Sequence, residues 1–337
     1  MNPDDGPIVV AVSGGGDSLA LMHLLASFAK TKQLEPPIVL TVDHGLRKGS
    51  GSDAKRVLAW AKQAGLKAHI LTWRGAKPKT GVEAAARDAR YRLMGAWLVK
   101  HKAATLYVGH TLDDQAETFL LRLARGSGVD GLAAMQPSTP WPVAGFASLS
   151  VRRPLLGIHR GELRSHLKAI GQDWLDDPMN DDDAFDRVRI RKAAAALEVA
   201  GLSSARIAAA AGHLARAREA LETMTQAVLS RAVRQIDGGV LVDPAALTAA
   251  PREVGLRALA SVLTSVSGQA YRPRFEALER LFDRVATDRV GGGVTLHGCH
   301  ICPAAKAQSG SCTAILAVRP ERPRKTGSSR KGRAATG

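Results

Sequence analysis

A glycine-rich hexapeptide, Ser-Gly-Gly-Gly-Asp-Ser at residues 13–18, is the first segment whose residue types could do chemistry. Three consecutive glycines allow a tight turn with inward-pointing backbone N–H groups, and the helix expected to begin there adds partial positive charge. Such a turn binds phosphate. The segment nevertheless lacks the lysine of the G-x-x-x-x-G-K-S/T loop and the spacing of G-x-G-x-x-G. A plain turn in which Asp17 or Ser18 caps the helix is the alternative.

Two further polar clusters contain carboxylates that could hold a cation or move a proton. The first is Asp-His-Gly-Leu-Arg at 43–47, and the second is Gly-His-Thr-Leu-Asp-Asp-Gln-Ala-Glu at 109–117. Carboxylate oxygens are ligands that Mg²⁺ prefers, and carboxylates also serve as general bases. The alternative for the second cluster is an acidic helix N-terminus that complements the helix dipole.

The elements that must position these clusters alternate between strands and helices. Apolar runs at 8–12, 38–42, 68–73 and 105–110 read as buried strands, and a helix-like segment follows each of them. This alternation predicts an α/β fold, an open parallel sheet with helices on both faces. Because ligands bind beyond the carboxyl ends of such strands, the three polar clusters are expected to converge on one site.

The pattern changes after residue 151 and predicts a second domain. An alanine-rich stretch from about 202 indicates one long helix, a second helix is expected near 251–266, and a glycine-flanked strand lies within 291–303. We therefore expect an α/β domain over 1–200 that contains the glycine-rich turn, a smaller, mostly helical domain over 201–318, and a disordered basic tail over 319–337.

The charge balance favours a polyanionic partner. The chain has 47 Lys and Arg against 31 Asp and Glu, a formal net charge of +16. A basic surface of this kind suits nucleic acid, although charge alone does not separate RNA from DNA. Aromatic residues make up only 4% of the chain, so we expect charge and shape, more than base stacking, to bind the partner.

Composition also predicts a location. There is no long apolar run and the first residues do not resemble a signal peptide, so we expect a cytoplasmic protein that binds no membrane. Three cysteines, Cys299, Cys302 and Cys312, are too few for a disulfide scaffold. The first two have C-x-x-C spacing beside His297 and His300, but one such pair within a strand does not provide a tetrahedral zinc set, so a plain strand is favoured.

Ser-Gly-Gly-Gly-Asp-Ser resembles the S-G-G-x-D-S loop of the PP-loop ATP pyrophosphatase superfamily, whose members cleave ATP between its α and β phosphates to adenylate a substrate. Within it, successive segments resemble the signatures of the tRNA(Ile)-lysidine synthetase family in the expected order: 43–47, 83–91, 109–135, 153–156, 174–180 and 185–191. The long 109–135 match is specific to that family. Met179 and Val188 depart from its pattern, which usually has serine and asparagine there.

The resemblance implies an enzyme with ATP and Mg²⁺ as cofactors and two further substrates, L-lysine and the tRNA(Ile) that has a CAU anticodon. The oxygen at C2 of the wobble cytidine would be adenylated, and the lysine amine would then displace AMP and form lysidine. The modified tRNA reads AUA as isoleucine instead of AUG as methionine. A loop that serves this chemistry needs no γ-phosphate lysine, because the α phosphate must stay accessible.

The resemblance also implies roles for individual residues. ATP would be bound by Ser13, Gly14, Gly15, Gly16, Asp17, Ser18, His44, Gly109 and His110. Catalysis is expected from Asp43, Asp114, Glu117 and Arg187, and magnesium binding from Asp17 and Asp114. Lysine or tRNA would be bound by Glu83, Arg87, Arg90, Asp113, Arg122, Arg125 and Arg191. Without the resemblance, the first three of these could be an ordinary solvated helix face, and so could Arg189.

Two rival functions remain at this point. A tRNA thiolase of the same superfamily usually needs cysteines in or near its catalytic domain, and none precedes Cys299. A noncatalytic RNA-binding protein with a degenerate nucleotide site is the rival from another class. Assembly as a homodimer is compatible with either an enzyme or a binding protein.

Overall fold

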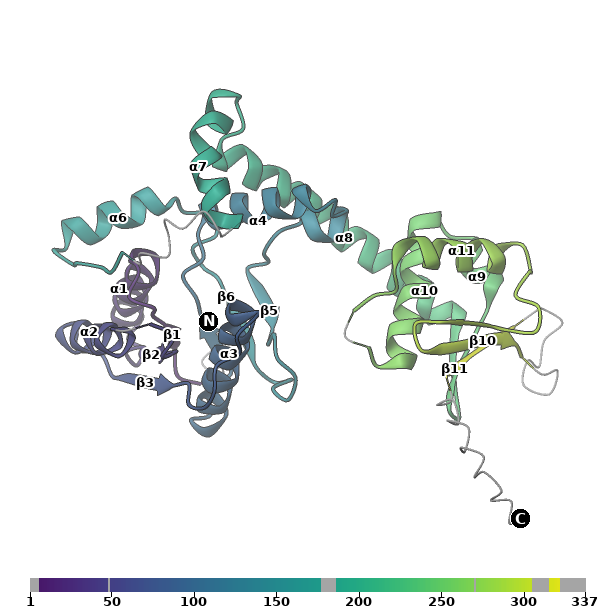
Figure 1. Cartoon of the computed structure of the whole chain (residues 1–337), viewed down its shortest axis with the longest axis horizontal. Helices are drawn as coiled ribbons and strands as arrows, with labels where there is room; N and C mark the ends of the chain where they lie inside the picture. The colour runs from purple at the N-terminus through teal and green to yellow at the C-terminus, as the bar shows by residue number, and fades with distance from the viewer. Residues whose placement is uncertain (1–5, 48, 177–185, 270, 305–314, 322–337) are drawn as a thin grey trace, which may run out of the picture. The chain divides into compact units, whose positions relative to one another are not determined.

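The computed structural model describes residues 6–47, 49–176, 186–269, 271–304 and 315–321 (Figure 1). The chain divides into two compact units, Met1–Ala217 and Arg218–Gly337. The division falls inside the long helix α8 (Ser204–Ala232), downstream of residue 200, where the sequence pattern predicts a boundary.

A six-stranded sheet in the order β3-β2-β1-β4-β6-β5 forms the centre of the first unit. All neighbouring pairs are parallel except β5 with β6. Val9 of β1 lies opposite Ile38 of β2 on one side and Leu106 of β4 on the other. The strand order therefore reverses at β1, the position beside which open α/β sheets bind ligands. The strands are β1 (Val9–Ala11), β2 (Ile38–Asp43), β3 (Ala68–Thr72), β4 (Thr105–Tyr107), β5 (Ser138–Pro140) and β6 (Ser150–Arg152).

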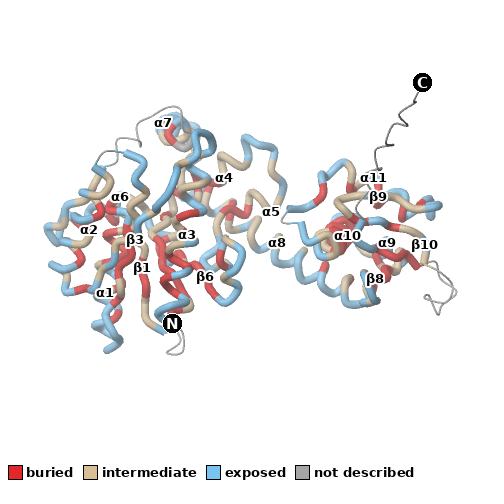
Figure 2. Tube along the Cα trace, turned by 60° about the horizontal axis from the view of Figure 1, so that its bottom comes forward, coloured by how far each residue is buried: buried red, intermediate tan, exposed pale blue. Residues whose placement is uncertain are grey.

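Helices cover both faces of this sheet, which confirms the predicted α/β class. Successive residues of a strand point to opposite faces, so Val10 packs in one hydrophobic cluster with Leu21 of α1. Its neighbour Val9 packs in the other cluster with Leu98 of α3. Figure 2 shows buried residues concentrated along these strands. The first cluster takes in α1 (Gly16–Thr31), α2 (Ser50–Gln63) and α6 (Arg160–Ala169), and the second takes in α3 (Val82–Lys100).

Three more helices lie wholly in the first unit: α4 (Leu112–Ala124), α5 (Val129–Leu132) and α7 (Asp186–Val199). A reciprocal capping box starts α4, in which the Thr111 side chain accepts from the backbone N–H of Asp114 and the Asp114 carboxylate accepts from the N–H of Thr111. Within the described ranges no single helix has the length and apolar content of a membrane span, and only the bent pair Val188–Val199 and Ser204–Ala232 meets these criteria by length and composition.

The second unit combines helices with a five-stranded antiparallel sheet in the order β7-β8-β11-β10-β9. The sequence predicts its helices and a strand within 291–303, but not the extent of this sheet. A signal was present, because Asp237 and Gly238 form the two-residue turn of the β7–β8 hairpin, with Gly238 at a φ of 68°. The elements are β7 (Val233–Ile236), β8 (Gly239–Val242), α9 (Pro244–Thr248), α10 (Arg252–Ser267), α11 (Phe275–Ala286), β9 (Val294–Leu296), β10 (Cys299–Pro303) and β11 (Leu316–Pro320).

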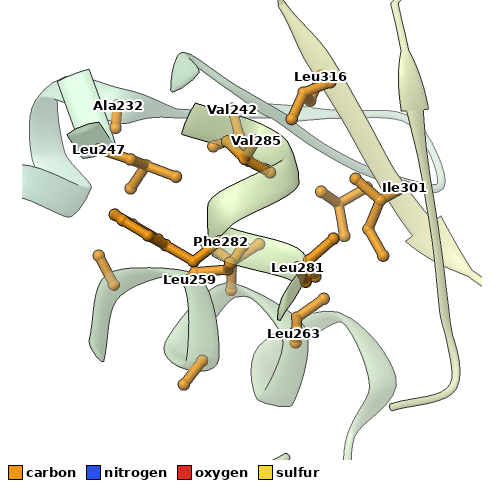
Figure 3. Packing of buried hydrophobic residues seen from close by; sticks show 14 of the residues in the cluster. Ala232, Val242, Leu247, Leu259, Leu263, Leu281, Phe282, Val285, Ile301 and Leu316 are labelled. Atoms are coloured by element: carbon orange, nitrogen blue, oxygen red, sulfur yellow. The ribbon is translucent and has the colours of Figure 1, made fainter. Parts of the chain in front are cut away.

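The core of the second unit lies between this sheet and its helices. Leu259 and Leu263 of α10, Phe282 of α11, Ile301 of β10 and Leu316 of β11 belong to one hydrophobic cluster (Figure 3). All five side chains are buried. Burying large aliphatic and aromatic groups of this kind stabilises the fold by roughly 1.5–3 kcal/mol for each side chain.

Two expectations near the C-terminus meet the structure only in part. Strand β11 includes Arg319 and Pro320, the first two residues of the expected disordered tail, and everything from 322 lies outside the described residues, as does Cys312.

Burial raises the pKa of the Cys299 thiol to about 11, and the S–H group donates to the carbonyl oxygen of Leu263 at 3.3 Å. Cys299 is therefore a protonated core residue.

Candidate nucleotide-binding and catalytic site

The glycine-rich loop connects β1 to α1 and is braced by its own serines. The Ser18 hydroxyl donates to the carbonyl oxygen of Gly15 at 2.8 Å and accepts from the backbone N–H of Ser13 at 3.2 Å. Gly14 has a φ of 96°, which favours glycine. Helix α1 begins at Gly16 and its cap residue Gly15 makes no side-chain capping bond. Asp17 and Ser18 are therefore not helix caps but lie in the first turn.

Two other segments approach this loop closely. A Cβ atom at Gly109 would lie 2.8 Å from the carbonyl oxygen of Asp17, so only glycine lets the end of β4 lie against the loop. A Cβ atom at Gly14 would lie 2.5 Å from Cδ1 of Leu175, whose backbone N–H donates to the Gly14 carbonyl at 2.9 Å. The polar clusters after β1 and β4 are thus in contact at one edge of the sheet.

Three carboxylates meet around the guanidinium of Arg160, the first residue of α6. Its Nε donates to Oδ2 of Asp17 at 3.0 Å, its Nη2 to Oδ1 of Asp114 at 3.2 Å, and its Nη1 to Oε1 of Glu117 at 3.4 Å. The side chains of Asp114 and Glu117 are 11% and 7% exposed, so they are largely shielded from water. We call this group, Asp17, Asp114, Glu117 and Arg160, the acidic cluster.

Burial and Arg160 have opposing effects on these carboxylates. Burial raises the pKa of Asp17, and Arg160 offsets the rise only in part. Burial also raises the pKa of Asp114, but Arg160 and hydrogen bonds from Thr111 outweigh it and lower the pKa overall. The Thr111 hydroxyl and backbone N–H both donate to Oδ2 of Asp114 at 2.8 Å. At neutral pH the cluster therefore combines an anionic Asp114 with a charged Arg160.

Asp43 and His44 stand at the carboxyl end of β2, beside β1. Oδ1 of Asp43 accepts from the backbone N–H of Gly45 at 3.0 Å and from the hydroxyl of Ser50 at 2.7 Å, which fixes the loop before α2. The His44 ring meets the Trp73 ring edge-on at 6.2 Å. Nδ1 of His44 is buried and has no hydrogen-bond partner among the described residues.

The imidazole of His44 should titrate below its ordinary value of 6.5, because burial and then Arg90 lower its pKa. Replacing Arg90 with methionine removes one of these causes and should raise the midpoint seen by NMR of the ring protons. Since the pKa is lowered only in the folded protein, His44 contributes stability that is lost as pH falls through 6.5 and below. Arg92→Met, which changes an exposed neighbour, is the control and should leave the midpoint unchanged. An unchanged midpoint in Arg90→Met would contradict this account.

The residues of α3 and of the end of α4 that are expected to bind lysine or tRNA make contacts of other kinds. The guanidiniums of Arg87 and Arg90 lie 5.0 and 5.7 Å from the centre of the Tyr91 ring, and Glu83 is exposed in the first turn of α3. Nη1 of Arg122 donates to the carbonyl oxygens of residues 131 and 134 at 2.6 and 3.1 Å. Arg122 thus holds the segment after α4, whose C-terminal cap is the exposed Arg125.

Two more charged residues connect the acidic cluster to its surroundings. Arg191 of α7 donates two hydrogen bonds to the Glu117 carboxylate, from Nε to Oε1 at 2.6 Å and from Nη2 to Oε2 at 3.1 Å. Oδ2 of Asp113 accepts from the backbone N–H of Arg160 at 2.7 Å. His110 directly precedes Thr111, and its charge also lowers the pKa of Asp114. The side chain of Arg187 lies outside the described residues, as does all of 177–185.

Sequence reasoning missed Arg160, Thr111 and Ser50. The T-x-x-D spacing from Thr111 to Asp114 is a readable capping signal. No local pattern marks Arg160, because its importance arises only when α6 folds beside α1 and α4.

Comparisons with known proteins agree with this geometry. A family model described as a PP-loop domain matches residues 2–197. A protein of Ruegeria pomeroyi named tRNA(Ile)-lysidine synthase is 41% identical over 293 residues, covering 87% of this chain and 68% of its own length. One of the same name from Methylobacterium nodulans is 39% identical over 326 residues, covering 96% and 92%. A third, from Wolbachia pipientis, is 36% identical over 87% of this chain and 68% of its own.

A solved structure shares the fold. The U34-tRNA thiolase NcsA from Methanococcus maripaludis has a TM-score of 0.50 and 18% identity, and the match covers 64% of this chain and 72% of that one. At this identity the likeness concerns the fold alone.

Proposed function

The chain belongs to the PP-loop family and, within it, to the tRNA(Ile)-lysidine synthases, and from this premise we propose that it ligates L-lysine to C2 of the wobble cytidine of tRNA(Ile) with a CAU anticodon. The reaction consumes ATP and releases AMP and pyrophosphate. It forms a C–N bond, so the protein is a ligase that modifies tRNA.

The observation that carries the proposal is the convergence of three segments on one sheet edge. The glycine-rich loop, the Asp43 loop and the start of α4 come from β1, β2 and β4, which are neighbours in the sheet. The backbone N–H groups proposed to bind phosphate thus belong to the same site as the carboxylates of Asp17, Asp114 and Glu117. The loop has no lysine of the P-loop kind. This arrangement suits adenylation, in which pyrophosphate leaves, better than transfer of a γ phosphate.

Magnesium fits the acidic cluster. The donor atoms are carboxylate oxygens, which Mg²⁺ prefers, and Oδ1 of Asp17 is buried without a hydrogen-bond partner in the ranges that the structure describes. We propose that Asp17 and Asp114 hold the ion, which when bound neutralises phosphate charge. Ser13, Ser18 and the backbone of Gly14, Gly15 and Gly16 bind the phosphates, while His44, Gly109 and His110 line the rest of the ATP site.

The other carboxylates act on lysine. Its ε-amine has an ordinary pKa near 10.4 and attacks only after it loses a proton, so a neighbouring carboxylate must orient it and accept that proton. We assign this part to Asp43 and Glu117. Arg187 and Arg191 suit AMP or tRNA phosphate because the guanidinium is a planar fork of donors.

The net charge of +16 supports a tRNA partner. The proposed contacts to lysine or tRNA in the first unit are Glu83, Arg87, Arg90, Asp113, Arg122 and Arg125, of which the arginines suit tRNA phosphate. The proposal includes a cytoplasmic location, no membrane partner and assembly as a homodimer.

Analysis of the nucleotide products tests the reaction type. With ATP, Mg²⁺, lysine and tRNA(Ile), the protein should release AMP and pyrophosphate in step with the tRNA consumed, and omission of tRNA should stop steady release. Formation of ADP and phosphate would contradict adenylation. Modification that requires a sulfur donor instead of lysine would favour the thiolase rival.

A further inference from the structure

We propose that Arg160 is a positioning residue that competes with a divalent cation for Asp17 and Asp114. Its guanidinium holds the two carboxylates in the nucleotide-free protein. When Mg²⁺–ATP binds, Asp17 and Asp114 would hold the ion instead, and the guanidinium of Arg160 would be free to turn towards the polyphosphate. This inference rests on the proposed function in one respect, since it takes Mg²⁺–ATP as the ligand of this loop.

The geometry of the guanidinium carries the first step of the argument. Each of its three nitrogens faces a different carboxylate, those of Asp17, Asp114 and Glu117, at 3.0, 3.2 and 3.4 Å. Charge-assisted N–H···O bonds are usually about 2.7–2.9 Å, so these three are long. Arg160 is thus shared among the carboxylates and not locked into one bidentate pair, which makes exchange for another cation easier.

Glu117 does not depend on Arg160. Arg191 already binds both of its carboxylate oxygens, at 2.6 and 3.1 Å. Asp17 and Asp114 form ion pairs with Arg160, and Arg164 acts on Asp17 only as a weaker electrostatic neighbour in the described part of the chain. When Arg160 moves, these two carboxylates lose its positive charge, and they are the pair that would then hold a divalent ion.

The described residues contain no group of three or more acidic, histidine or cysteine side chains arranged to hold a metal ion. The position of Arg160 accounts for this at the acidic cluster, because a guanidinium stands between carboxylates that would otherwise converge. Partly buried carboxylates that share one guanidinium repel one another, and a cation between them relieves this repulsion. A guanidinium is only weakly hydrated and can fill this position without the dehydration that Mg²⁺ requires.

The backbone of Arg160 stays anchored while its side chain exchanges partners. Its N–H donates to Oδ2 of Asp113 at 2.7 Å, and it begins α6, whose Leu163 and Leu167 are buried against the α1 side of the sheet. Movement of the guanidinium therefore requires rotation about side-chain bonds only. The competing interpretation is that Arg160 is simply a structural pin between α1, α4 and α6.

Divalent-cation binding without nucleotide separates the two interpretations. Arg160→Met removes the guanidinium, and Lys168→Met on the exposed side of the same helix removes one positive charge as the control. Mn²⁺, which carboxylates bind much as they bind Mg²⁺, is titrated by EPR in the absence of ATP. Arg160→Met should bind Mn²⁺ at least about tenfold more tightly than the wild type, and Lys168→Met should match the wild type.

Thermal unfolding adds a readout that a structural pin would not move. Arg160→Met should unfold at a lower temperature than the wild type in EDTA, and Mg²⁺ should restore much of the loss by binding the folded state. Mg²⁺ should have little effect on the wild type or on Lys168→Met. A variant that is destabilised, is not restored by Mg²⁺ and binds Mn²⁺ like the wild type would overturn the proposal.

If Arg160→Met does not fold, Arg160→Lys decides. Lysine keeps the charge but cannot reach three carboxylates at once, so Mn²⁺ should bind more tightly than to the wild type, and unchanged binding would overturn the proposal. None of these assays uses lysine or tRNA. Release of ADP by the wild type would thus refute the proposed function without altering the Mn²⁺ result.

Discussion

Replacing Asp43 with asparagine should lower the rate of lysidine formation at least about a hundredfold while the protein stays folded. Oδ1 of Asp43 accepts from Gly45 and Ser50, and the amide oxygen of asparagine can keep both bonds. Oδ2 accepts no hydrogen bond from the described residues, so the negative charge is the main loss. The rate is measured with saturating ATP, lysine and tRNA.

Asp88→Asn is the matched control. It makes the same chemical change in an exposed ion pair with Arg92, and such pairs contribute little to stability. Its rate should equal that of the wild type. Near-normal turnover in Asp43→Asn would remove this carboxylate from the chemistry and leave it as an anchor of the loop before α2.

Glu117→Gln should also lower turnover at least about a hundredfold, because the change removes the proposed proton acceptor and leaves its surroundings nearly isosteric. Glu117 is buried and binds two arginines, so some loss of stability accompanies the change: removal of one partner of a buried ion pair costs roughly 3–5 kcal/mol. The rate must therefore be measured well below the unfolding temperature of the variant.

Glu198→Gln, at an exposed position of α7, is the charge-matched control and should keep full activity. A second comparison separates chemistry from folding. Arg191→Lys weakens the same ion pair but keeps the Glu117 carboxylate and a positive charge at position 191. With saturating ATP and tRNA it should therefore lose stability with a much smaller loss of rate than Glu117→Gln. Equal losses in both variants would show that the ion pair, and not the carboxylate, sets the rate.

The strands and the glycine-rich loop of the first unit could be predicted because their signals are local. The runs that became β1 to β4 are apolar and short, and those of β1, β2 and β4 each precede a polar cluster at their carboxyl end. The loop at 13–18 is recognisable from six consecutive residues. These patterns involve residues that are neighbours in the sequence, so they can be read without knowledge of the tertiary structure. The parallel sheet follows from the alternation of the strands with helices.

The connections between distant elements could not be predicted in the same way. Arg160 lies 143 positions from Asp17, and Arg191 lies 74 positions from Glu117, so no periodicity relates them. An arginine in the first turn of a helix reads equally well as a solvated residue. The sheet of the second unit was missed for a different reason: its strands are only three to five residues long and lie among helical segments, so helix periodicity dominated the pattern.

Transfer of radiolabelled lysine to tRNA tests the central claim most directly. Protein, ATP, Mg²⁺ and labelled lysine are incubated with tRNA(Ile) that has a CAU anticodon or with elongator methionine tRNA, which presents the same wobble cytidine. Our account predicts label in the isoleucine tRNA and very little in the methionine tRNA, because nucleotides away from the reacting base must supply the discrimination. Equal labelling of both tRNAs, or none in either, would contradict it.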